Sequence, residues 1–273
     1  MKYSISLIII LIFVLMSSCD QVSKPYLQDN GNTPIDTNIK KKILLEDYTG
    51  FKCGNCPYAH EKINTLLEKY GGKIIPIAVH CGFFAMPDPK HNYDFRTSVG
   101  NEWDNFFGLS NSGLPKGMIN RQGYSNSLHI LSYDSWEQAI INALDGDAIV
   151  NIILEASLKN NNIEIKVDYN YKKELVQYHN LNVLIIEDSI VQYQKWYSHD
   201  PEDVYDYLHM HVLRAGVNGA WGDVLTSQSG TKNYTFTIPT GVDWNVKNLK
   251  VVAFISDIGN TYEVYQAEET AVK

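Results

Sequence analysis

Apolar and polar positions predict a strand, a helix and a second strand early in the folded part of the chain. Residues 43–48 and 73–80 are short, mostly apolar runs of strand length. Between them, apolar side chains recur at the spacing of one helix face, at Ile63, Leu66, Leu67 and Tyr70. The glycines at positions 71 and 72 predict the end of this helix. Residues 118–120 are strand-like again.

The second half of the chain has a different pattern. A last helix is expected over residues 136–144, and after it residues 163–171 alternate between apolar and polar side chains without a break. Such alternation is typical of a half-buried antiparallel strand. Further strands are expected over 150–158, 181–186, 208–213, 234–238 and 249–255. The order predicts an α/β domain over residues 41–146, followed by an all-β sandwich over residues 147–273.

The start of the chain is expected to lie outside both domains. Residues 7–16 form an apolar run that is too short to cross a bilayer as a stable helix but suits a secretory signal. Its end, Leu15-Met16-Ser17-Ser18-Cys19, resembles a lipobox, in which the cysteine is acylated after cleavage. We therefore expect a signal peptide over 1–18, a membrane anchor through a lipid on Cys19, and a flexible tether over 19–40. The alternative is an ordinary signal peptide before a chance cysteine.

Composition and charge exclude several classes of protein. With 44% hydrophobic and 20% charged residues the chain is globular rather than disordered. A net charge of −8 without a concentrated basic stretch argues against nucleic acid as a partner. Four cysteines are too few for a disulfide scaffold, and no cofactor is expected.

The candidate chemistry lies in Cys53-Gly54-Asn55-Cys56-Pro57, between the first predicted strand and the first predicted helix. The positive end of a helix dipole stabilises a thiolate, so Cys53 is expected to attack a disulfide. Cys56 lies one turn further along and is expected to resolve the mixed disulfide by forming the internal bond. Pro57 suits the first turn of a helix, where amide groups lack acceptors.

A carboxylate close to the motif is expected to carry a proton. Asp47 lies six residues before Cys53, near the end of the first predicted strand, and Glu46 is beside it. Alternation along a strand directs one of the two side chains inward but does not say which. We expect Asp47 to exchange a proton with Cys56, with Glu46 or neither carboxylate as the alternatives.

Two other uses of the cysteines stay open at this point. Cys53 and Cys56 could form a static disulfide, although so short a loop constrains the unfolded chain little. They could instead bind copper or zinc with His60, His80 or Cys81, but a second cysteine pair is lacking. Later in the chain, His209 and His211 would share one face of the strand expected over 208–213. Without a third ligand nearby, they suit a strand surface better than a metal site.

The region from about residue 42 to residue 144 resembles the thioredoxin superfamily. The resemblance rests on the strand, the Cys-x-x-Cys motif, the helix, the next strand and Ser112-Gly113-Leu114-Pro115. It implies that Pro115 is a cis-proline that contacts a substrate strand opposite the cysteines. The segment 83–110 is longer than a minimal member of the superfamily needs, and we expect it to form a helical insertion over the redox site.

The whole arrangement resembles a narrower family, the 28-kilodalton outer-membrane-protein-related lipoproteins. The resemblance rests on the lipobox, on Leu45-Glu46-Asp47-Tyr48-Thr49-Gly50 before the motif, and on His209-Met210-His211-Val212-Leu213-Arg214. It implies a lipid-anchored protein of the cell envelope, in the outer membrane. It supports location and fold more than it supports a reaction.

The sequence therefore leads to one main hypothesis and two alternatives. The main hypothesis is a thiol-disulfide oxidoreductase of the envelope that acts on proteins carrying thiols or disulfides, with Cys53, Cys56, Asp47 and Pro115 at its site. The first alternative is a non-catalytic binding lipoprotein that uses a thioredoxin-like scaffold. The second is a protein that handles metal.

Overall fold

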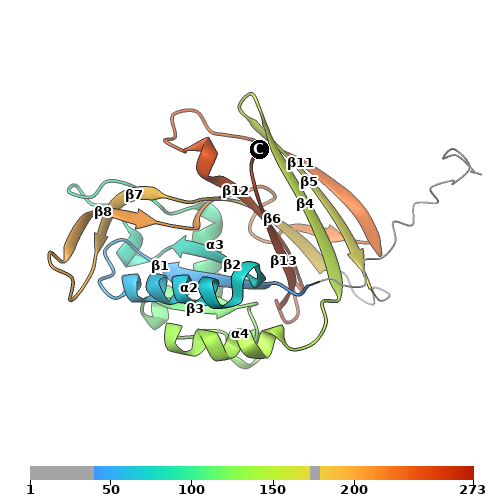
Figure 1. The fold of residues 1–273 in the computed structure, drawn as a ribbon, viewed down its shortest axis with the longest axis horizontal. Helices are drawn as coiled ribbons and strands as arrows, with labels where there is room; N and C mark the ends of the chain where they lie inside the picture. Colours follow the sequence, from blue (N-terminus) through green and yellow to red (C-terminus); the bar gives the residue numbers. More distant parts are fainter. Residues whose placement is uncertain (1–39, 173–178) are drawn as a thin grey trace, which may run out of the picture. The chain divides into compact units, whose positions relative to one another are not determined.

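The computed structural model describes residues 40–172 and 179–273, which belong to one compact unit (Figure 1). The expected signal peptide, Cys19 and all but the last residue of the expected tether lie outside the described residues. The described chain has a mixed, sheet-rich fold with few helices, in which an α/β part is followed by a β-rich part. This order confirms the coarse part of the expected fold class, an α/β part followed by a β-rich part.

The α/β part starts with two parallel strands joined by a helix. Strand β1 pairs in parallel with β2 and antiparallel with β3, so β1 lies between them. The helix ends where the two glycines predict, because Gly71 has a positive φ of 56°. The elements are β1 (Ile43–Thr49), α2 (Cys56–Tyr70), β2 (Ile74–His80), α3 (Ser98–Phe107), β3 (Lys116–Ile119) and α4 (Trp136–Leu144).

The β-rich part follows α4 without a further α-helix in the described residues. Each strand expected in this part corresponds to a strand of the structure, except the one over 208–213; the strand expected over 234–238 runs one residue past the end of β11. The elements are β4 (Val150–Lys159), β5 (Asn162–Tyr171), β6 (His179–Glu187), β7 (Ile190–Lys195), β8 (Asp203–His209), β9 (Val212–Gly216), β10 (Asp223–Leu225), β11 (Ser229–Thr237), β12 (Leu249–Ser256) and β13 (Val264–Ala271).

One large sheet joins the two parts. Its strands run in the order β13-β12-β6-β9-β2-β1-β3, with β10 added beside β6. The contact between the parts is made where Ala78 of β2 faces Val212 of β9. Strands from both sides of the boundary expected at residue 146 therefore belong to this one sheet, and the division into two domains stays a prediction.

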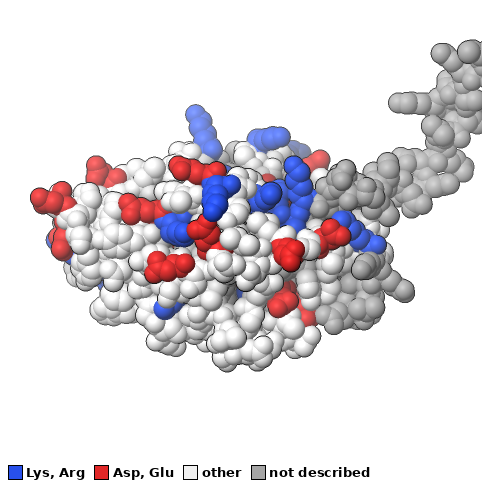
Figure 2. Space-filling model, turned by 60° about the horizontal axis from the view of Figure 1, so that its bottom comes forward, with Lys and Arg blue, Asp and Glu red and all other residues white. Residues whose placement is uncertain are grey.

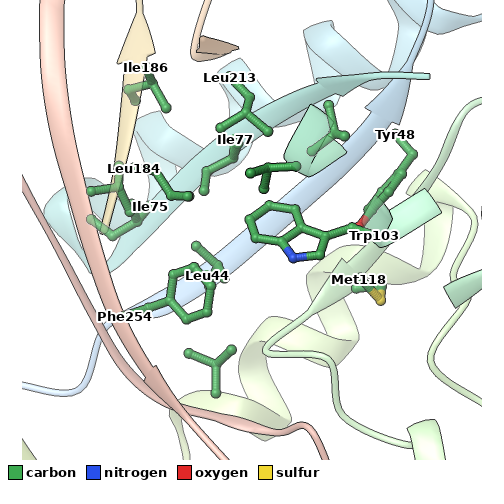
Figure 3. Close-up of a cluster of buried hydrophobic side chains, with 14 of the residues drawn as sticks. Leu44, Tyr48, Ile75, Ile77, Trp103, Met118, Leu184, Ile186, Leu213 and Phe254 are labelled. Carbon is green, nitrogen blue, oxygen red and sulfur yellow. The ribbon is translucent and has the colours of Figure 1, made fainter. Parts of the chain in front are cut away.

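The two faces of this sheet carry different layers. Helix α3 covers one face, over a core that runs from β1 and β2 to β6, β9 and β12; Figure 3 shows Trp103 of α3 and Phe254 of β12 in this core. On the opposite face, α2 and α4 pack on β1 through Leu45, Ile63 and Ile140. Further along that face, the small sheet β11-β5-β4 packs on β6 and β12. The two-layered packing at this end is a feature of a β-sandwich.

The prediction of a single strand over 208–213 is wrong, because the backbone turns within this segment. Strand β8 ends at His209, and β9 begins at Val212. His211 between them has a positive φ of 57°, and its backbone amide donates a hydrogen bond to Asp188 Oδ1 over 2.8 Å. His209 and His211 therefore do not share a strand face.

The distribution of charged side chains on the surface agrees with the lack of a concentrated basic stretch in the sequence. On the face drawn in Figure 2, acidic and basic side chains are interspersed, and no broad basic patch is seen. Among the helices of residues 40–172 and 179–273, none is both long enough and apolar enough to span a membrane.

Candidate functional site

Cys53 and Cys56 form a disulfide where the loop after β1 enters α2. Their Cα atoms are 5.4 Å apart, and Cys56 is the first residue of the helix. The turn is closed by the Cys56 amide, which donates to the Cys53 carbonyl over 3.2 Å. Pro57 occupies the first turn, where its missing N–H costs no helical hydrogen bond. The motif therefore stands at the positive end of the helix dipole, where a thiolate is stabilised.

Pro115 lies at the same end of the sheet as the motif. Lys116 of β3 faces Tyr48 of β1, so the residue before Lys116 lies at the end of β1 that leads to Cys53. Pro115 is buried, and the peptide bond between Leu114 and Pro115 is cis. Its contact with a substrate strand stays a prediction.

The structure separates the roles of the two neighbouring carboxylates. Both Glu46 and Asp47 are fully buried, and they point to opposite faces of β1. Asp47 faces α2, where its Oδ2 lies 3.4 Å from Nε2 of His60. Neither oxygen of Asp47 accepts a hydrogen bond from the described residues. A buried carboxylate in that state is costly, which is typical of a functional group.

Glu46 belongs instead to a buried ion pair on the α3 face. Arg121 donates from Nε and Nη2 to the two Glu46 oxygens over 2.9 and 2.8 Å, and both side chains are fully buried. The Arg121 guanidinium also lies 4.6 Å from the ring centre of Trp103. Arg121 could not be predicted from the sequence, because nothing local indicates that an arginine after a short strand enters the core.

His60 connects Asp47 to the β-rich part. It lies four residues after Cys56 on α2, so the two side chains share one helix face. Its Nε2 is 3.1 Å from Thr49 Oγ1, and its Nδ1 is 2.7 Å from the hydroxyl of Tyr207 on β8. The sequence analysis considered His60 only as a metal ligand and missed Tyr207. The spacing of Cys56 and His60 was a usable signal, whereas the position of Tyr207 depends on long-range packing.

A cavity with room for a few water molecules lies beside this group. Asp47, His60 and Tyr207 line it, together with His80 and His209, whose rings are 5.5 Å apart. Burial, and then the charge of His60, holds the pKa of His209 down at about 3. Burial also lowers the pKa of His80 well below its usual value, with smaller effects from His209 and His60. Both rings are therefore neutral near pH 7.

A hairpin from the β-rich part covers the motif. Strands β7 and β8 form it, and its tip lies over Gly54. The Tyr197 amide donates to the Gly54 carbonyl over 2.8 Å, and Gln194 Nε2 donates to the Cys53 carbonyl over 3.0 Å. A methyl group on Gly54 would lie 2.5 Å from the Tyr197 ring. As a result, Cys53 is only 3% exposed and Cys56 is fully buried.

The sequence predicts that the insertion over residues 83–110 covers the redox site, and the structure agrees with this prediction only in part. Residues 83–110 contain α3, as expected, but α3 packs on the sheet face opposite to Asp47 and α2. The start of the insertion contacts Lys52, just before the motif: the Phe84 carbonyl accepts the Lys52 amide over 3.0 Å, and Lys52 Nζ lies 5.2 Å from the centre of the Phe83 ring and 3.8 Å from Asp88 Oδ2. The cover over the motif therefore comes mainly from hairpin β7–β8, which the sequence analysis did not predict.

Cys81 is a buried thiol beside the site and not within it. It lies in the core on the α3 face, where burial and then the charge of Asp104 raise the pKa of its thiol far above the usual value. The chain from 40 to 172 and from 179 to 273 contains no group of three or more His, Cys, Asp or Glu side chains arranged to hold a metal ion.

Comparisons with solved structures agree with this architecture. HBP35 of Porphyromonas gingivalis is similar over 86% of this chain and 76% of its own, at 19% identity and a TM-score of 0.64. A protein of Agrobacterium tumefaciens is similar over 86% of this chain and 96% of its own, at 13% identity and a TM-score of 0.50. Identities this low show a shared fold only.

A solved domain of the outer membrane lipoprotein Omp28 from Porphyromonas gingivalis is similar over 47% of this chain and 91% of its own, at 21% identity and a TM-score of 0.34. Among curated proteins, none matches the chain.

A family model described as outer membrane protein Omp28 matches residues 101–273. The match runs from α3 to the end of the chain, so it includes hairpin β7–β8, while the cysteine motif precedes it. It confirms the expected location in the outer membrane of the cell envelope. Since the match covers more than half of the sequence, the chain belongs to the Omp28 outer membrane protein family.

Proposed function

We propose that this protein is a thiol-disulfide oxidoreductase of the cell envelope with a thioredoxin-like site. The observation that carries the proposal is the Cys53–Cys56 disulfide at the start of α2, with the buried carboxylate of Asp47 on the face of β1 that α2 covers. The parallel strands β1 and β2 on either side of α2, with β3 antiparallel to β1 after Pro115, support a thioredoxin-like arrangement. A lipid on Cys19 would hold this site at the membrane.

The proposed reaction exchanges one disulfide for another. In the reducing direction, the Cys53 thiolate attacks a disulfide of a protein substrate, and one substrate sulfur leaves as a thiolate that takes up a proton. The Cys56 thiol then gives its proton to Asp47 and attacks the sulfur of Cys53. The Cys53–Cys56 bond forms, the second substrate thiolate leaves, and two electrons have passed to the substrate. The oxidising direction reverses these steps.

The burial of both cysteines favours a second candidate, a non-catalytic binding protein with a static disulfide. A protein substrate must reach Cys53, and hairpin β7–β8 closes the site in the described structure. In this candidate the disulfide only fixes the loop after β1, and the hairpin and the β-rich part contact the partner.

Trapping of mixed disulfides separates the two candidates. In Cys56→Ser the resolving thiol is absent, so envelope proteins should accumulate on Cys53 as mixed disulfides that a reductant releases. The matched control is Cys53→Ser, which should trap none. The oxidoreductase proposal fails if Cys56→Ser traps no more protein than Cys53→Ser, and the purified wild-type chain neither reduces nor oxidises a model disulfide.

A further inference from the structure

We infer that His60 and Tyr207 form a proton path between Asp47 and the histidine-lined cavity, so that hairpin β7–β8 contributes a positioning residue to the thiol-disulfide site. The inference rests on the proposed function and extends it. It assigns roles to one residue of α2 and one of β8 that neither the family nor the motif assigns.

The first step concerns how Asp47 equilibrates with solvent between the two half-reactions. Formation of the disulfide puts a proton on Asp47, and reduction of the disulfide returns one to Cys56; in between, Asp47 can exchange with solvent only through the groups beside it. Asp47 is fully buried, and no described residue donates a hydrogen bond to it. The structure places Nε2 of His60 beside it, at 3.4 Å from Oδ2.

The second step is that the other face of the His60 ring has a partner of its own. Nδ1 lies 2.7 Å from the Tyr207 hydroxyl, a short hydrogen-bond distance. Tyr207 stands on β8, in the hairpin that also covers Gly54 with Tyr197. Asp47, His60 and Tyr207 all line the same cavity, which also reaches Leu208, a half-exposed residue. Water in the cavity therefore has a route to solvent.

The third step is that a proton can move along this path in either direction, with every proton accounted for. When Asp47 holds the proton and His60 carries its hydrogen on Nδ1, Nε2 accepts the proton from Asp47. Nδ1–H then passes its proton to the Tyr207 oxygen, and Tyr207 O–H releases one to a cavity water. The ring now carries its hydrogen on Nε2 and Asp47 is ionised, which is the state that delivers a proton inward by the reverse steps. One proton moves, and no oxidant or reductant is needed.

Four titratable side chains and one hydroxyl surround His60 in the cavity. The titratable groups that face it are Asp47 from β1, His80 from β2, and Tyr207 and His209 from β8; Thr49 adds a hydroxyl. His80 and His209 stay neutral near pH 7 because burial lowers their pKa values. Burial, followed by the charges of Asp47 and Glu61, raises the pKa of Tyr207, so Tyr207 takes part as a neutral hydroxyl.

The test follows the two thiol steps separately. The full chain, reduced and carrying Cys19→Ser, is mixed with dithiobis-nitrobenzoate in a stopped-flow instrument. The first release of nitrothiobenzoate reports the attack by Cys53, and the second reports the attack by Cys56 on the mixed disulfide. Both rates are measured from pH 5 to pH 9, a range that extends two units to either side of neutral pH. The proteins compared are the wild type, Asp47→Asn, His60→Gln and Tyr207→Phe.

We expect the second rate to fall by roughly 10²-fold in Asp47→Asn, the lower end for loss of an acid–base group. In His60→Gln and Tyr207→Phe it should fall by about tenfold, with its pH profile flattened, while the first rate stays within about twofold of wild type. Tyr205→Phe, which changes an exposed tyrosine on the same strand, is the matched control and should keep both rates.

Failure of the inference differs from failure of the proposed function. If His60→Gln and Tyr207→Phe keep the wild-type profile of the second rate while Asp47→Asn loses it, Asp47 exchanges directly with cavity water and the path is wrong. If the wild type shows no second release, the oxidoreductase proposal itself is wrong. Should His60→Gln not fold, Tyr207→Phe, which removes only a hydroxyl, decides the question.

Discussion

At the scale of single residues, β1 places two adjacent carboxylates in two different surroundings. Glu46 and Asp47 have the same chemistry and the same full burial, but β1 turns them to opposite faces of the sheet. Glu46 meets the guanidinium of Arg121 and is neutralised there. Asp47 meets an imidazole and a cavity, where a proton can be exchanged. The position of each side chain in the strand decides its role.

The Glu46–Arg121 pair should be costly to break. Glu46→Gln leaves a buried guanidinium without a compensating charge, so we expect the free energy of unfolding to fall by about 3–5 kcal/mol. The control is Asp94→Asn, which breaks the partly exposed pair with Arg96 and should cost about 0–1 kcal/mol. Chemical denaturation of both variants measures the difference. Equal losses would contradict a structural role for Glu46.

The buried histidines should make the protein less stable in mild acid. The pKa of His209 is about 3 in the folded protein, against an ordinary value of 6.5. Between these pH values the unfolded chain binds more protons, so the stabilisation is complete above about pH 6.5 and is lost as the pH falls toward 3. His80 acts in the same direction.

We expect His209→Gln to reduce the slope of unfolding free energy against pH by about 1.4 kcal/mol per pH unit below pH 6. Urea denaturation at pH 5, 6 and 7 measures the slope. His199→Gln changes an exposed histidine and should leave the slope as it is. An unchanged slope in His209→Gln would mean that His209 has the same pKa in the folded and the unfolded protein.

At the scale of elements, hairpin β7–β8 acts as the cover of the cysteine motif. Its attachment includes hydrogen bonds from Gln194 to Cys53 and from Tyr197 to Gly54, together with the contact between the Tyr197 ring and Gly54. Tyr58 adds a hydrogen bond of 2.6 Å from its hydroxyl to the Tyr197 carbonyl. Further hydrogen bonds run from the Lys195 amide to the Phe51 carbonyl over 2.7 Å and between Tyr207 and His60 over 2.7 Å. Local contacts of this kind open more readily than a core does.

Shortening Tyr197 should therefore expose the disulfide. Tyr197→Ala removes the ring above Gly54, and a loss of about 1 kcal/mol of closing contacts raises the open fraction roughly fivefold. We expect dithiothreitol to reduce the Cys53–Cys56 bond faster by the same factor, as measured by quenched alkylation. Tyr205→Ala, on the same hairpin but without contact to Gly54, should keep the wild-type rate. Equal rates in the two variants would show that the hairpin does not limit access.

Local sequence patterns predicted most of the helices and strands, because the formation of such an element depends largely on neighbouring residues. The alternation over 163–171 and the helix that ends at Gly71 both appear as expected. The hairpin cover was not predictable, since it depends on which distant loop meets Gly54. The break at His211 was missed because a positive φ in a non-glycine residue leaves no mark in the hydrophobic pattern. Of the site, the cysteines and Asp47 follow from spacing, while Tyr207 and Arg121 follow only from tertiary packing.

At the scale of the whole molecule, the core of the α/β part is completed by the β-rich part. Leu184 and Ile186 of β6, with Phe254 of β12, pack into the same cluster as Leu44 of β1 and Trp103 of α3 (Figure 3). The Trp103 indole N–H also donates to the Ala220 carbonyl over 2.7 Å. The two parts therefore share both a sheet and a core.

A fragment of residues 41–146 should not fold by itself. Without β6, β9 and β12, it exposes the face of β1 and β2 that carries Leu44 and Ile77, and it leaves the Trp103 indole without its acceptor. We expect no cooperative thermal transition in this fragment by near-ultraviolet circular dichroism, whereas residues 41–273 unfold in one transition. A cooperative transition in the fragment would instead support two independent domains.

The unreactive thiol of Cys81 gives this molecule an internal reporter of unfolding. Cys81 is fully buried in the shared core, and burial raises the pKa of its thiol. A thiol reagent therefore reaches it only when α3 and the strands beneath it separate. In a chain with the other three cysteines replaced by serine, the labelling rate of Cys81 measures how often the joint core opens in the native state. No engineered probe is needed, because the sequence already places one thiol at the junction of its two parts.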